Sequence, residues 1–119
     1  MTLKLTKQYK RKMTKKLLSE LSFYRSSMDY CTRLTNIENL SLRKSRIART
    51  RLLTLSNTIQ AVEQAISHLS GPERDIIELH YIKEHTFSEI EEIFHLERSS
   101  VYRYHVMAVD KIAAVLYGD

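Results

Sequence analysis

Apolar residues recur at helical spacing along most of this chain, and the residues that interrupt helices are almost absent. The 119 residues include only two Gly and one Pro, so the loops must be few and short. No segment alternates apolar and polar side chains over the length of a strand. The sequence therefore predicts an all-α fold, large enough for one or two small domains but not for a large enzyme cleft.

The first segment with a helical stripe begins near Tyr9 and extends to Cys31. Its apolar residues follow one another at steps of three or four, a spacing that keeps them on one face of a helix. They are Tyr9, Met13, Leu17, Leu21, Tyr24, Met28 and Cys31. We therefore expect one long amphipathic helix with Cys31 buried in its seam. A single cysteine cannot form an internal disulfide framework, which fits a reducing compartment.

A second stripe follows an irregular stretch over residues 32–46, whose Asn and Ser residues favour turns or caps. Its members match the spacing of a coiled-coil seam, and they are Leu52, Leu55, Ile59, Val62, Ile66 and Leu69. Each of the two helices thus carries one narrow apolar stripe that must be buried. The pair can fold on itself as an antiparallel hairpin, or it can form a coiled-coil arm with a second protomer.

The clearest boundary in the chain is the tetrapeptide from Ser70 to Glu73. A small polar residue, a Pro in the first turn and a Glu shortly after it are signals for the start of a helix. We place the boundary between two units here. Residues 1–69 form a basic helical arm, and residues 70–119 form a terminal domain of three to four helices. The first helix of that domain is expected over about residues 72–83.

Two short helices joined by a tight turn are predicted between Thr86 and His105. Thr86 and Glu89 form a capping box, and the helix that follows runs to about Phe94. We expect this helix to bury Phe87, Ile90, Ile93 and Phe94. After a turn over residues 95–97, apolar residues of the last helix recur at Val101, Tyr104, Ala108, Ile112 and Val115. This arrangement is typical of a helix-turn-helix, whose second helix enters the major groove of DNA.

The start of the last helix carries a small polar and cationic face. Short hydroxyl side chains permit a close approach to phosphates and base edges, and arginine can bind guanine or clamp a phosphate. His105 could contact the DNA backbone or close the core. The predicted DNA-binding residues are Arg98, Ser99, Ser100, Tyr102, Arg103 and His105. A solvated helix start explains the residue types alone equally well, and the two-helix context favours DNA.

The net charge of +5 hides a strong asymmetry. Residues 1–51 contain 14 Lys and Arg against 3 acids, whereas residues 52–119 contain 5 against 11. The basic half is therefore not the half with the helix-turn-helix. Phosphate neutralisation supplies much of DNA affinity, so we expect the arm to supply phosphate contacts, or dimerisation through the arm to double the sites. The predicted phosphate-binding residues are Lys10, Arg11, Lys12, Lys15, Lys16, Arg43, Lys44, Arg46, Arg49 and Arg51.

The sequence offers no sign of an enzyme, a metal site or a cofactor. Its five histidines include no HxxxH or HExxH pair, and there is no second cysteine. A Gly-rich phosphate loop and the residue order of a serine hydrolase are also absent. We expect no catalysis, no cofactor and no small-molecule substrate. The longest apolar run, Ile112–Tyr117, is too short for a membrane span, so we expect a cytoplasmic protein with no membrane partner.

Residues 69–116 resemble the C-terminal DNA-binding region of bacterial sigma factors. The matching features are a leading L..PER, the Tyr that closes the first helix, T.SEI at the start of the second helix and L.RSSVYR at the start of the recognition helix. With the helical arm in front, the whole chain is similar to small phage regulators of the ArpU and RinA type. That resemblance implies sequence-specific DNA binding and activation of late genes of a phage or prophage, inside a bacterial host cell.

The chain departs from the sigma-factor pattern at two turn positions. The Gly that usually precedes the second helix is replaced by Glu84 or His85, and the Gly of the central turn is replaced by His95. The resemblance therefore implies a left-handed backbone at non-glycine residues, which is uncommon but allowed.

The leading hypothesis is a transcriptional regulator that binds double-stranded DNA, with RNA polymerase as a further partner and a homodimer through the N-terminal helices as an option. Two other functions fit the same pattern. A small terminase subunit of a phage, which serves in DNA packaging, also joins a helix-turn-helix to an oligomerising helical segment. A module that binds RNA polymerase without a DNA site of its own is the third hypothesis.

Overall fold

The computed structural model describes residues 5–37 and 40–118. In these two ranges it contains six α-helices, one π-helical segment and no strand, which confirms the predicted all-α class. The elements are α1 (Lys7–Ser19), α2 (Leu21–Thr35), α3 (Leu42–Ser67), α4 (Gly71–Ile77), the π-helical η1 (Glu78–Ile82), α5 (Phe87–Phe94) and α6 (Arg98–Tyr117). Within the described ranges, no helix is both long enough and apolar enough to cross a membrane.

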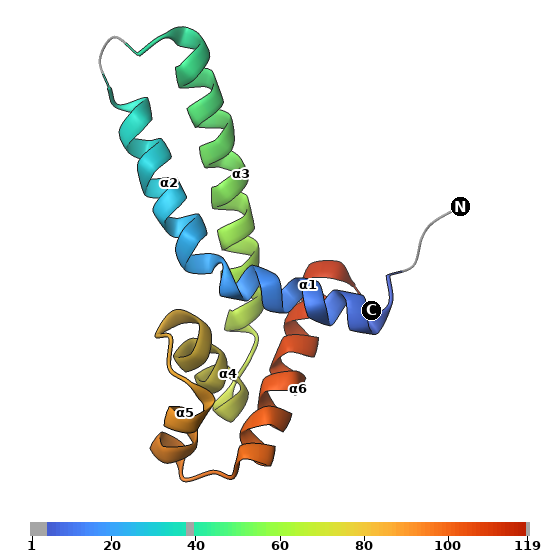
Figure 1. Cartoon of the computed structure of the whole chain (residues 1–119). Helices are drawn as coiled ribbons and strands as arrows, with labels where there is room; N and C mark the ends of the chain where they lie inside the picture. The colour runs from blue at the N-terminus through green and yellow to red at the C-terminus, as the bar shows by residue number, and fades with distance from the viewer. Residues whose placement is uncertain (1–4, 38–39, 119) are drawn as a thin grey trace.

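The N-terminal segment forms two helices instead of the single long helix expected from its stripe. They meet at Glu20, where the backbone turns to φ −97° and ψ 0°. Figure 1 shows α1 crossing the base of the α2–α3 pair and lying beside the end of α6. The buried residues of α1 are Thr14 and Leu18, whereas the predicted Leu17 is half-buried and Tyr9 is exposed. The reason is that α1 packs on α6 and α2 packs on α3, so one straight stripe could not serve both partners.

Helices α2 and α3 form an antiparallel hairpin within one chain (Figure 1). Towards its base the predicted stripe of α3 is buried at Ile59, Val62 and Ile66, while Leu52 and Leu55 nearer the tip are half-buried. Cys31 is also buried, as expected. The chain therefore adopts the antiparallel hairpin, which is one of the two arrangements that the apolar stripes allowed.

The main core joins the base of this hairpin to α1, α4 and α6. It lies across the boundary expected at residue 70, because α6 packs against α1 and α3 as well as α4 and α5. Its buried members are Leu18, Leu21, Ile59, Val62, Ala65, Ile66, Leu69, Ile77, Ala108, Val109 and Ile112. A smaller cluster of Ile76, Ile90 and Val101 holds the helix-turn-helix together.

Two local expectations for the C-terminal part are wrong. Ile93 and Val115 are 48% and 51% exposed, because α5 buries only Ile90 fully and α6 turns a broader face to its several neighbours. The helix start predicted at Ser70–Glu73 is confirmed, because α4 begins at Gly71 with Ser70 as its N-cap and Pro72 in its first turn, although the Ser70 side chain makes no cap hydrogen bond. Glu73 is buried against α6, where its carboxylate pairs with Lys111 at 2.8 Å.

Candidate nucleic-acid interface

The turns on either side of α5 set the positions of the two helices of the helix-turn-helix. Thr86 caps α5 through the predicted capping box, in which the Glu89 backbone N–H donates to the Thr86 hydroxyl at 3.2 Å. His95 ends α5 in the left-handed region at φ 53° and ψ 44°, and the Leu96 N–H then donates to the carbonyl of Glu91 at 3.1 Å. Glu84 is also left-handed, at φ 59°. Both turn positions therefore adopt the backbone that glycine normally supplies.

Substituting His95→Gly should stabilise the protein by about 0.5 to 1 kcal/mol. A left-handed conformation costs a non-glycine residue roughly 1–2 kcal/mol, and the greater freedom of glycine in the unfolded chain offsets about half of that gain. Urea denaturation would measure the change. Glu92→Gly is the matched control, since it places glycine inside the exposed face of α5 and should cost about 1 kcal/mol. Destabilisation by both substitutions would contradict the strain assigned to His95.

The predicted recognition face is exposed on the first turns of α6. The side chain of Arg98 is 76% exposed, and its Nε lies 3.8 Å from Glu91 on α5. Tyr102 is 55% exposed, and the Arg103 guanidinium lies 5.4 Å from the centroid of the Tyr104 ring. Ser99 is exposed and Ser100 is half-buried at the edge. Five of the six predicted DNA-binding residues therefore share one accessible end of α6.

The sixth of these residues, His105, lies in the core and not on the exposed face. Only 3% of it is exposed, and its Nε2 shares a 2.6 Å hydrogen bond with the Tyr81 hydroxyl. Phe87 and His80 pack around its ring, with centroids 5.1 and 5.8 Å away. Burial lowers the pKa of His105 to about 4 and raises the pKa of Tyr81 to about 12. An imidazole that is buried and uncharged at neutral pH cannot neutralise a phosphate.

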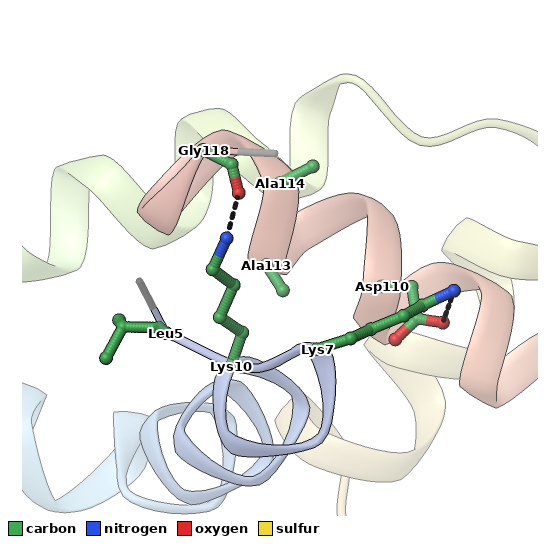
Figure 2. Close-up of a pocket in the computed structure, with 7 residues that line it drawn as sticks. All are labelled: Leu5, Lys7, Lys10, Asp110, Ala113, Ala114 and Gly118. Atoms are coloured by element: carbon green, nitrogen blue, oxygen red, sulfur yellow. Dashed lines mark hydrogen bonds and ion pairs between the residues drawn. The ribbon is translucent and has the colours of Figure 1, made fainter. Parts of the chain in front are cut away.

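Contacts between α1 and α6 use two of the cations that were predicted to bind phosphate. The guanidinium of Arg11 donates two 2.8 Å hydrogen bonds to the carboxylate of Asp110. Lys10 donates to the carbonyl of Gly118 at 2.9 Å, and Lys7 lies 3.9 Å from Asp110 (Figure 2). The hydrogen bonds from Arg11 are the main reason why the pKa of Asp110 is lowered. Sequence reasoning did not single out Asp110, because nothing in the sequence placed it opposite the first helix.

The remaining predicted phosphate-binding residues fall into two separate groups. On α1, Lys12 and Lys16 are exposed and Lys15 is half-buried, and Lys15 adds to the lowering of the pKa of Asp110. The second group is exposed at the first turns of α3, at the tip of the hairpin, and consists of Arg43, Lys44, Arg46, Arg49 and Arg51. Helix α3 is about 39 Å long, and Figure 1 shows its start and the start of α6 at opposite ends of the molecule. The structure thus places the lysines of α1 beside α6, whereas the cations at the tip of the hairpin lie far from it.

Among the described residues, no cluster of three or more His, Cys, Asp or Glu could hold a metal ion.

One comparison with known proteins found a match, and it covers the helix-turn-helix. No curated protein and no solved structure matches the chain at a significant level. Residues 59–112 match the family model described as Sigma-70, region 4, a stretch from the last turns of α3 to the C-terminal third of α6. The C-terminal part of this protein is therefore a sigma-factor-like helix-turn-helix region.

Proposed function

We propose that this protein regulates transcription by binding a specific site on double-stranded DNA, with the start of α6 in the major groove. The observation that carries the proposal is the exposed face of Arg98, Ser99, Tyr102 and Arg103 on the second helix of a sigma-like helix-turn-helix. Arginine and short hydroxyl side chains are the groups that read base edges and phosphates. The capped α5 and the left-handed turn at His95 hold that face in place.

Helix α1 is the part of the basic arm that we expect to hold the flanking DNA backbone. Arg11 of α1 pairs with Asp110 of α6. Asp110 lies twelve residues after Arg98, so the two residues are about 18 Å apart along α6. That distance is comparable to the width of a DNA duplex, so Lys12, Lys15 and Lys16 would lie beside the duplex while α6 occupies the groove. The acidic balance of residues 52–119 makes such support necessary, because Arg98 and Arg103 alone would neutralise few phosphates.

Substituting Arg103→Ala should weaken binding to the preferred DNA site about tenfold to a hundredfold and reduce its preference over random DNA. The site would first be selected with the full-length protein from a random duplex library, and affinities would be measured by fluorescence anisotropy. Arg74→Ala is the matched control, because Arg74 is a half-exposed arginine on α4 that pairs with Glu78, away from the recognition face. Equal losses in the two variants, or no preferred site at all, would argue against recognition by α6. A selection that yields no preferred site would favour the third hypothesis, a module that binds RNA polymerase without a DNA site of its own.

The salt dependence of binding should separate the two groups of cations. Replacing Lys12, Lys15 and Lys16 with glutamine should lower the slope of log K against log salt by about 2 to 3, since each lost phosphate contact removes about 0.9. Replacing Arg43, Arg46 and Arg49 at the tip removes the same charge and should leave the slope unchanged. The opposite result would place the DNA backbone at the tip of the hairpin.

The biological role that we propose is activation of phage or prophage genes, on the strength of the resemblance to ArpU and RinA type regulators. The hairpin supports a regulator over a terminase subunit, because α2 and α3 bury their stripes on each other and need no second protomer. Light scattering should therefore give a monomer or dimer. A ring of about eight or more protomers would favour DNA packaging instead.

A further inference from the structure

A groove runs along one side of the hairpin, between α2 and α3. It consists of two hollows of about 510 and 340 Å³ that have Tyr30, Cys31 and Arg51 in common. One hollow extends to Phe23 near the base of the hairpin, and the other extends to Lys44 near the tip. All the residues that line this hairpin groove lie outside the sigma-like match, which begins at residue 59.

The walls of the hairpin groove expose large apolar side chains to solvent. Phe23 is 68% exposed, Tyr30 is 55% exposed and Ile47 is 53% exposed. All three line the groove, and the Cys31 side chain forms part of its floor. Exposed aromatic and aliphatic residues gathered in one hollow mark an interaction surface far more often than scattered ones do. The groove between two helices is also the shape that accepts a third helix.

The charge around the hairpin groove is positive. Lys44 and Arg51 line it, and Arg46 lines a third hollow that shares Ile47 and Arg51 with it. None of the described residues that line these hollows is acidic. A ligand that fits must therefore bring both an apolar face and negative charge.

We infer that the hairpin groove binds an acidic amphipathic helix of a partner protein. Apolar side chains at positions i, i+3, i+4 and i+7 of such a helix would cover Phe23, Tyr30 and Ile47. Its acidic residues would face the lysine and arginines at the rim. A second copy of this chain fits poorly, because residues 21–58 contain seven Lys and Arg against two acids, and two such hairpins repel each other. Nucleic acid would satisfy the cations but leave the apolar walls without a partner.

The proposal can be tested with the full-length protein and a synthetic peptide of about 18 residues, five helical turns. The peptide carries Leu and Phe on one helical face, Glu on the other and fluorescein at its end. We expect saturable binding by anisotropy that weakens as salt rises, and no comparable binding of the same peptide with Lys in place of Glu. Ile47→Ala and Arg51→Glu should each weaken binding by about tenfold. Leu53→Ala is the matched control, since Leu53 is 63% exposed on α3 but does not line the groove.

Several results would overturn the proposal. The acidic peptide could fail to bind, the lysine peptide could bind equally well, or Leu53→Ala could cost as much as Ile47→Ala. A dimer in sedimentation that Ile47→Ala abolishes would identify a second copy as the occupant. If the wild-type protein does not bind the peptide and Arg51→Glu loses DNA binding, nucleic acid is the occupant of the hairpin groove. Because all three substituted side chains are exposed, circular dichroism should show an unchanged fold, and Ile47→Ala and Leu53→Ala should bind the selected DNA site at the wild-type level.

Discussion

Acidification from about pH 6.5 to about pH 4 is expected to destabilise the folded protein by about 3 kcal/mol through His105 alone. Burial lowers the pKa of His105 to about 4 in the folded state, from an ordinary value of 6.5, and the charges of His80 and Lys15 act in the same direction. The unfolded chain takes up a proton below pH 6.5 while the folded chain does not. The stabilisation is therefore complete above pH 6.5 and is lost as the pH falls towards 4, by roughly 1.4 kcal/mol for each unit of pKa difference.

Urea denaturation over this pH range would measure the effect. His105→Gln removes the titrating group and should flatten the dependence of the free energy of unfolding on pH, whatever it does to stability at neutral pH. Val109→Ala is the control, because it disturbs the core without removing a titratable group and should keep the wild-type slope. If His105→Gln keeps that slope, the buried imidazole is not its source.

Truncating Leu18 to alanine should cost about 3 kcal/mol, within the range of roughly 2–5 kcal/mol found when a buried leucine leaves a cavity. Leu18 is fully buried in the core that joins α1, the hairpin and α6. We expect α1, the hairpin and the helix-turn-helix to unfold in one transition, since they share that core. Helicity and tyrosine fluorescence should report it together, and the protein has seven Tyr and no Trp.

The neighbouring substitution Leu17→Ala tests the register of α1. Leu17 is only half-buried, so its truncation should cost about 1 kcal/mol, in proportion to the smaller area removed from water. The apolar stripe in the sequence favours the opposite order, with Leu17 inside. A larger loss at Leu17 than at Leu18, or two separate unfolding transitions, would contradict the packing of α1 described above.

The parts of the fold that follow from the sequence are those with local causes. The stripe of α3 continues without interruption towards Leu69, and it is buried at Ile59, Val62 and Ile66. The capping box at Thr86 needs only residues within the first turn of α5. The left-handed turn at His95 followed from alignment with a known pattern, because a histidine by itself gives no reason to expect it.

The features that the sequence did not reveal depend on contacts between helices that are far apart in the chain. Nothing at Glu20 resembles a helix stop, since it is not Gly or Pro and the stripe continues through it. The break exists because α6 offers α1 a second surface, with Asp110 as a partner for Arg11. His105 shares its hydrogen bond with Tyr81, twenty-four residues earlier in the chain, and no local pattern records that contact.

The shared core at the base of the hairpin fixes how the hairpin groove is oriented relative to α6. Leu18 and Leu21 anchor the base of the hairpin in the same core as α6. If α6 binds in the major groove as proposed, a partner protein in the hairpin groove would therefore stand on a fixed side of the duplex and at a fixed distance from the bound site. If that partner also binds DNA, inserting half a turn of DNA between the two sites should disrupt their joint binding, and inserting a whole turn should restore part of it.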